Sequence, residues 1–185
     1  MDLVAGQELP LTGRIRMGVG WDKERTAGAM GTGAPDIDLD ATAVQFAGGE
    51  LFDLAFYNNL ATRDGSVVHL GDNQTGTGDG DDETLTVDLD RVHGPVDTIV
   101  LLVSSYQGHT LEWVNRAYCR VADEQDAELA RFRLTGGTSQ TGLVLATLKR
   151  VAPDQGSGWV LRAIGEGVAI TVPSQGIAKL KPFTG

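Results

Sequence analysis

Short apolar segments separated by turn residues run along most of this chain. In the clearest of them, residues 83–89, Leu85, Val87 and Leu89 share one face opposite polar side chains. Alternation with a period of two is the pattern of a β-strand with one buried face. We predict strands at residues 11–21, 36–46, 51–57, 66–70, 83–89, 98–103, 118–122, 128–134, 142–151 and 158–164.

Two segments depart from this alternation. Residues 98–103 form a continuous apolar run, which predicts a central strand that is buried on both faces. Leu111, Val114 and Tyr118 have helical spacing, so one or two helical turns are expected over residues 110–117. Many short strands at near-regular spacing predict an all-β fold, an antiparallel β-sandwich with one or two short helices.

Composition agrees with this fold class and limits the domain organisation. The chain has 185 residues, which is enough for one domain, and its 25 glycines indicate many tight turns. We assign residues 1–168 to the sandwich and residues 169–185 to a C-terminal tail, with a possible short helix between Pro173 and Pro182.

The sequence also bears on compartment and on membranes. No apolar stretch approaches the ~18 residues of a membrane span, so direct membrane insertion is not expected. The N-terminus lacks a basic region followed by an apolar run, so we expect a cytoplasmic protein without a signal peptide. The single cysteine, Cys119, excludes a disulfide framework and a cysteine-based zinc site within one chain.

The chain is acidic, with a net charge of −10, which argues against a nucleic-acid partner. The acid is concentrated in two places. Asp36, Asp38 and Asp40 alternate within 36–40, and the segment 71–83 holds five acidic residues and four glycines. On a strand the three alternating carboxylates share one face, where like charges repel unless a cation lies between them.

Calcium matches this arrangement better than other metals. It takes 6–8 oxygen ligands, and strand neighbours two residues apart are separated by about 6.6 Å, so adjacent carboxylates can share an ion. The triplet can serve two neighbouring ions with Asp38 between them, or one ion with a bend near Pro35. The three histidines are scattered, which disfavours zinc and copper. The 71–83 segment is not an EF-hand, because Thr77 stands where that loop requires glycine.

We therefore predict calcium, as two ions, held by oxygens of two acidic segments and an Asn-Asn pair. The predicted ligands are Asp36, Asp38, Asp40, Asn58, Asn59, Asp72, Asn73, Asp79, Asp81, Asp82 and Glu83. For the three asparagines the alternative is that they only shape turns. For the acidic segments the alternative is a pair of solvated turns.

Other conspicuous side chains have simpler interpretations. Trp21, Trp113 and Trp159 are expected in the core. Cys119 is expected to be an inert buried thiol, and His69 a half-exposed strand histidine.

The acidic motifs and their order resemble the TerD family of bacterial tellurium-resistance and general stress proteins. The resemblance covers roughly residues 3–168, and its most specific stretch is Gly71-Asp72-Asn73-Gln74-Thr75-Gly76 followed by Gly78-Asp79-Gly80-Asp81-Asp82-Glu83. Matching segments stand at 19–22, 36–41, 56–59, 64–69, 113–121, 128–132 and 159–165. The resemblance implies a β-sandwich that binds calcium through these segments and acts in resistance to tellurite and other stresses.

The leading hypothesis is a non-enzymatic calcium-binding scaffold or stress sensor that docks unidentified protein partners, such as other tellurium-resistance proteins. One alternative is a calcium-dependent module that recognises glycans or anionic headgroups. Another is a hydrolase that uses paired carboxylates.

Overall fold

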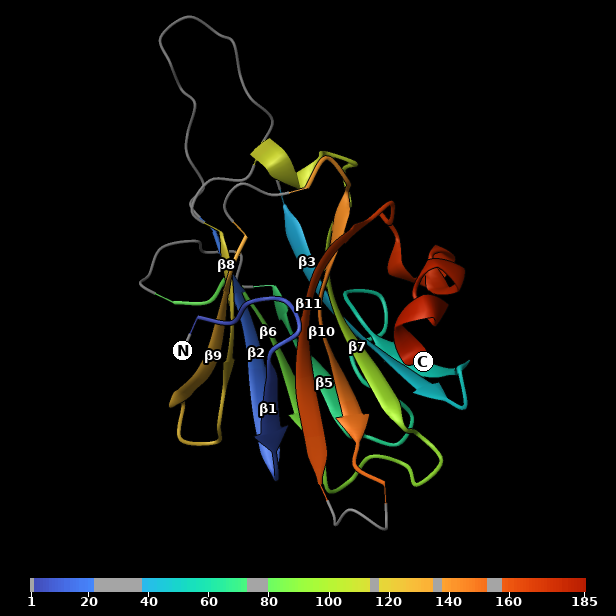
Figure 1. The fold of residues 1–185 in the computed structure, drawn as a ribbon. Helices are drawn as coiled ribbons and strands as arrows, with labels where there is room; N and C mark the ends of the chain where they lie inside the picture. The colour runs from blue at the N-terminus through green and yellow to red at the C-terminus, as the bar shows by residue number, and fades with distance from the viewer. Residues whose placement is uncertain (1, 22–37, 73–79, 114–116, 135–137, 153–157) are drawn as a thin grey trace, which may run out of the picture.

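The protein is a sandwich of two antiparallel sheets (Figure 1). The computed structural model describes residues 2–21, 38–72, 80–113, 117–134, 138–152 and 158–185. The six-stranded sheet has the order β1 (Glu8–Leu11), β11 (Trp159–Val168), β10 (Gly142–Arg150), β7 (Thr98–Ser105), β3 (Leu39–Ala47) and β4 (Glu50–Ala55). The five-stranded sheet has the order β5 (Val67–Asp72), β6 (Glu83–Asp88), β2 (Arg14–Gly20), β8 (Tyr118–Ala122) and β9 (Glu128–Arg133). The predicted all-β antiparallel sandwich is confirmed.

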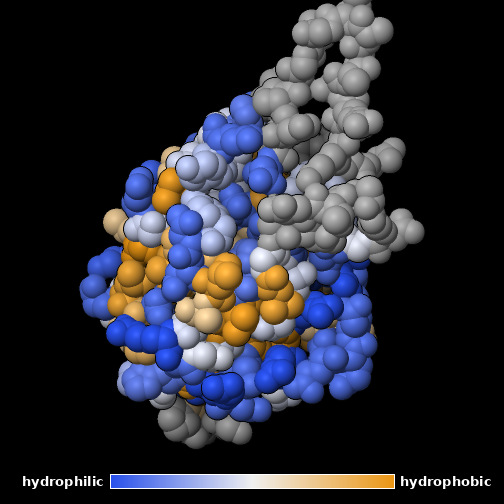
Figure 2. All heavy atoms as spheres, turned by 180° about the vertical axis from the view of Figure 1, so that it is seen from behind, coloured by the Kyte–Doolittle hydropathy of each residue, from blue (hydrophilic) through white to orange (hydrophobic). Residues whose placement is uncertain are grey.

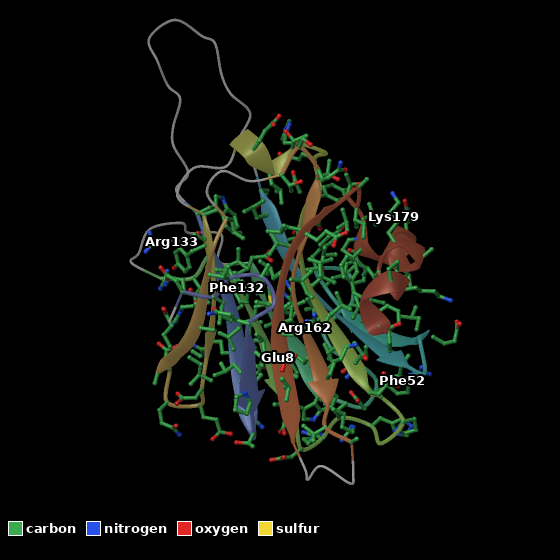
Figure 3. All side chains as sticks on the ribbon, viewed as in Figure 1. Glu8, Phe52, Phe132, Arg133, Arg162 and Lys179 are labelled. Carbon is green, nitrogen blue, oxygen red and sulfur yellow. The ribbon has the colours of Figure 1, made fainter. Side chains whose placement is uncertain are left out.

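Alternation along the strands fills the space between the sheets. Leu85 and Val87 of β6 are fully buried, and the polar residues that alternate with them are half-buried, as the sequence pattern predicts. On β9, Phe132 is buried and its neighbour Arg133 is exposed, and both are labelled in Figure 3. At the far edge of the other sheet, Glu8 of β1 is the register partner of Arg162 of β11 (Figure 3), which places opposite charges side by side.

The tail covers the outer face of the six-stranded sheet, and this explains why every residue of β7 is buried. Its turns are the 3-10 helices η3 (Pro173–Gln175), η4 (Ile177–Lys179) and η5 (Lys181–Thr184), drawn in red in Figure 1. Leu180 is fully buried there in a second apolar cluster with Phe46 and Leu102. Three 3-10 turns therefore take the place of the single short helix considered for the tail.

Two predicted elements were wrong in extent. The predicted strand at 11–21 is divided, because Gly13 adopts a positive φ of 69° and turns the chain from β1 into β2 of the other sheet. The helical turns expected over 110–117 are reduced to the 3-10 turn η1 (Leu111–Trp113), and no α-helix occurs in the described residues. Residues 114–116 lie outside the described ranges.

Most predicted core residues are confirmed. Trp21 and Trp159 are buried, whereas the side chain of Trp113 lies outside the description. Cys119 is buried, and burial, with a smaller contribution from Asp81, raises the pKa of its thiol well above the usual range. His69 is also buried, at 3% exposure, so the expectation of a half-exposed histidine was wrong. It follows Val67 on the inward face of β5, where the other sheet covers it.

Candidate functional site

A pocket of about 310 Å³ opens where strands of the two sheets approach each other. Its walls come from the start of β3, the segment after β4, the end of β5, the start of β6 and the loop after β7. The lining residues are Asp38, Asp40, Tyr57, Leu60, His69, Gly71, Glu83 and Tyr106. Three of the predicted ligands, Asp38, Asp40 and Glu83, are therefore brought to one cavity.

Glu83 reaches the pocket because it continues the inward face of β6. It precedes Leu85 by two residues, so its carboxylate is directed between the sheets, and the residue is 3% exposed. Its Oε2 accepts a hydrogen bond of 2.6 Å from the backbone N–H of Ala41 on β3. This bond ties the two sheets together at the pocket and fixes one oxygen of the carboxylate.

His69 lies beside Glu83, and its Nε2 is 3.4 Å from Oε2 of that carboxylate. Its Nδ1 accepts a 3.0 Å hydrogen bond from the backbone N–H of Gly71. In the neutral ring the proton then belongs on Nε2, which directs an N–H toward the pocket carboxylate. At this distance Nε2 makes no hydrogen bond, so His69 lies against Glu83 from the neighbouring strand without a hydrogen bond between the two side chains.

Asp40 enters from β3 and is 7% exposed. Burial, and next the charge of Asp40, raise the pKa of Tyr57 above its ordinary value, so the tyrosine stays a neutral phenol. The Tyr57 ring meets the Tyr106 ring edge to face, with centroids 5.5 Å apart. One wall of the pocket is therefore acidic and another is aromatic.

Asp81 lies outside the pocket lining and has a different set of partners. Its carboxylate receives two hydrogen bonds from Nε of Arg120, at 2.9 and 3.0 Å, and one of 3.2 Å from the Tyr118 hydroxyl. The hydrogen bond to Asp81 is the largest cause that raises the pKa of Arg120. The carboxylate lies over Gly18 of β2, where a Cβ would come within 2.0 Å of it. Asp81 thus anchors the chain that leads into Glu83.

Asp82 makes a second attachment to β2. Its Oδ2 accepts a hydrogen bond of 3.0 Å from the backbone N–H of Trp21, and its own N–H donates to the carbonyl of Val19 at 2.7 Å. Together with Asp81, it fixes the entry into β6 and hence the direction of Glu83.

The Asn-Asn pair forms a turn. Asn59 and Phe56 exchange two backbone hydrogen bonds of 3.0 Å, and Asn59 Nδ2 donates to the carbonyl of Leu54 at 2.7 Å. Both Asn58 and Asn59 are exposed and neither lines the pocket. This geometry agrees with the alternative in which the asparagines shape a turn.

The remaining predicted ligands fall outside the description. Asp36, Asn73 and Asp79 lie in segments that the structure does not describe, and of Asp72 only the backbone, in β5, is described. Within the described ranges, no group of three or more His, Cys, Asp or Glu side chains is arranged to hold a metal ion. Asp38, Asp40 and Glu83 share the pocket but do not by themselves form such a group.

Sequence reasoning overlooked the aromatic and apolar part of this pocket. Tyr57, Leu60 and Tyr106 lie in connections between strands, where no periodic pattern gives a direction to a side chain. His69 carried a usable signal, since it continues the inward face set by Val67. The resulting chemistry is that of hard carboxylate oxygens beside two phenol rings.

Comparison with known proteins gives the chain a family context. The TerD domain model matches residues 1–178. The tellurium resistance protein TerZ of Serratia marcescens is 38% identical over 156 residues, covering 82% of this chain and 79% of that protein. The stress response protein SCP2 of Bacillus subtilis is 33% identical over 187 residues, covering 90% and 92%.

A solved structure supports the fold. A crystal structure of a homologue of the telluride resistance protein TerD from Streptomyces coelicolor superposes with a TM-score of 0.75 at 20% identity, over 92% of this chain and 98% of that one. Among the described residues, no helix has the length and apolar character needed to cross a membrane.

Proposed function

Because the chain belongs to the TerD domain family, we propose that it is a calcium-binding stress-response protein that acts without catalysing a reaction. In this proposal it is a cytoplasmic scaffold or sensor in tellurite and general stress resistance, with other tellurium-resistance proteins among its partners. The names of its relatives refer to resistance and stress response, which supports the biological setting.

The observation that carries the calcium proposal is the pocket shared by Asp38, Asp40 and Glu83. Asp40 and Glu83 are more than nine-tenths buried, and carboxylates withdrawn from water on one cavity repel each other. A divalent cation removes this repulsion, and carboxylate oxygens are the ligands that calcium prefers. The donor set therefore fits calcium in kind, although three carboxylates do not complete its 6–8 oxygens.

Each residue has a distinct part in this proposal. Asp38, Asp40 and the second oxygen of Glu83 supply oxygens, while Oε2 of Glu83 also keeps its bond to Ala41. The predicted ligands Asp36, Asp72, Asn73 and Asp79 complete the sphere. Asp81 acts as a positioning residue, since its carboxylate is engaged by Arg120 and Tyr118.

Calcium titration by calorimetry on chelator-stripped protein, with magnesium as the control ion, tests the proposal. We expect saturable binding of one or two calcium ions together with a raised melting temperature. Asp40→Asn should weaken calcium binding at least about tenfold, because it removes a charged ligand. The matched control is Asp90→Asn, an acid-to-amide change at an exposed position outside the pocket, which should leave affinity unchanged. The absence of both heat and thermal shift at millimolar calcium would overturn the proposal.

A further inference from the structure

We propose that this pocket and the exposed apolar side chains beside it form a docking surface for a basic segment of a partner protein. An arginine of that segment enters the pocket with its guanidinium toward the carboxylates, in place of calcium. Docking itself depends only on the described residues, whereas the competition with calcium rests on the proposed function.

The first observation is an exposed apolar rim. Of the five large hydrophobic side chains exposed among the described residues, Leu60 and Tyr106 line the pocket, at 50% and 58% exposure. A third, Leu70, follows the inward-facing His69 on β5, so its side chain lies on the opposite face of that strand and is not part of the rim. Figure 2 shows apolar side chains gathered on the face turned away from the viewer in Figure 1. Grouped exposed apolar side chains mark an interaction site.

The second observation is the size of the cavity. A volume of 310 Å³ corresponds to roughly ten water molecules at about 30 Å³ each. A calcium ion that is surrounded by protein oxygens needs little of this room. The pocket has the dimensions of a small ligand site, and an extended side chain can enter it.

The third observation is the aromatic wall. Tyr57 and Tyr106 bring two rings, 5.5 Å apart, to the cavity that also holds Asp40. A metal ion with oxygen ligands gains nothing from such rings, whereas a guanidinium is attracted to their faces and stacks on them. The wall therefore favours an organic cation, and arginine over lysine.

The same chain already recognises arginine with this set of groups. The Asp81 carboxylate holds Arg120, and the Tyr118 hydroxyl donates to the same carboxylate. The guanidinium of Arg131 lies 4.3 Å above the Tyr118 ring. Asp40 and Tyr57 present the same two kinds of group in the pocket.

Charge and rim together define the partner. The net charge of −10 attracts a basic protein over a distance, and the pocket carboxylates take its cation at contact. The rim at Leu60 and Tyr106 requires apolar residues on either side of the arginine. We therefore infer an Arg between apolar residues, in an exposed segment of an otherwise basic partner.

The test uses fluorescence anisotropy with a labelled peptide, acetyl-Gly-Leu-Arg-Leu-Gly-amide, added to the full chain in chelator. The control peptide carries citrulline, which keeps the shape of arginine without its charge. We expect the arginine peptide to bind at least tenfold more tightly than the citrulline peptide. Tyr106→Ala and Leu60→Ala should each weaken binding at least threefold, whereas Leu51→Ala, at another exposed leucine, should not change it. Added calcium should displace the peptide.

Equal binding of the two peptides, or equal effects of Leu60→Ala and Leu51→Ala, would overturn the docking surface. Peptide binding that calcium does not reduce would refute the shared pocket. Calcium binding by calorimetry without peptide binding would refute this inference and leave the proposed function standing. Peptide binding without calcium binding would refute the proposed function and leave the docking surface standing. Calcium-dependent binding to phosphatidylserine vesicles without peptide binding would replace the basic partner with a membrane surface.

Discussion

Gly18 provides a sharp test of how the chain around Asp81 is held. It lies between the inward-facing residues Met17 and Val19, so a side chain at this position would point to the outer face of the sheet. A Cβ at this position would lie 2.0 Å from Oδ2 and 2.1 Å from Cγ of Asp81. Non-bonded carbon atoms approach to about 3.5 Å, so Gly18→Ala must displace the carboxylate.

The cost follows from the contacts that the carboxylate would lose. Asp81 is held by Arg120 and by the Tyr118 hydroxyl, and the side chains of Asp81 and Arg120 are only 5% and 17% exposed. Hydrogen bonds to charged groups contribute about 1.5–3 kcal/mol. Arg120 keeps its 2.9 Å contact with Asp126, so its charge stays compensated and the larger penalty of an unpaired buried ion does not apply. We expect Gly18→Ala to lower the free energy of unfolding by about 2–3 kcal/mol.

Urea unfolding followed by circular dichroism measures this change, and the melting temperature should fall by roughly 4–12 °C in a chain of this size. The matched control is Gly94→Ala, because no atom lies within 4 Å of a Cβ at Gly94. That variant should stay within about 0.5 kcal/mol of the parent. In an Asp81→Ala background, Gly18→Ala should lose most of its effect, since no carboxylate remains to be displaced. Equal stability of the two alanine variants would refute the described packing.

Three further outcomes are expected. Glu83→Gln keeps an acceptor for the Ala41 N–H but removes a buried charge, so without calcium its urea midpoint should not fall. Calorimetry should show at least about tenfold weaker calcium binding. A large loss of stability in chelator would contradict this expectation. Burial raises the pKa of Asp64, but four hydrogen bonds outweigh it and lower that pKa to about 2. Because the pKa of Asp64 is lower in the folded than in the unfolded chain, its carboxylate stabilises the fold above about pH 4, and this stabilisation is lost as the pH falls from about 4 to 2. After allowance for solvent screening, Asp64→Asn should lower the free energy of unfolding by roughly 1 kcal/mol at pH 7. It should also flatten the acid limb of a curve of stability against pH. An unchanged acid limb would exclude this role. Leu180→Ala opens a cavity under the tail and should cost about 2–5 kcal/mol by urea unfolding, whereas a cost below about 1 kcal/mol would mean that the tail does not hold the second core.

Local pattern was sufficient for much of the architecture. The alternation at Leu85 and Val87 predicted β6 and its buried face, and the apolar run at 98–103 predicted a strand covered on both sides. Such patterns are readable because strand geometry relates sequence spacing directly to faces. Where the pattern was interrupted, prediction failed. The turn at Gly13 depends on backbone dihedrals, and loose alternation continued across it.

The sequence predicted the chemistry of the site, whereas the tertiary structure decided which residues lie in it. The density of carboxylates in 36–40 and 71–83 indicated a cation, because like charges at these spacings need one. Sequence spacing could not assign different roles to Asp81 and Glu83, because they are only two residues apart where one predicted strand begins. Asp81 accepts hydrogen bonds from Arg120, thirty-nine positions away, while Glu83 accepts one from the backbone of Ala41, forty-two positions away. These partners are decided only by the pairing of β2, β6 and β8 and by the packing of the two sheets. The sequence by itself thus determined most of the strands and the acidity, and it predicted a cation as the ligand. The tertiary structure decided which carboxylates share a cavity with His69 and the two tyrosines, since contacts between residues far apart in the chain depend on strand order and register rather than on local pattern.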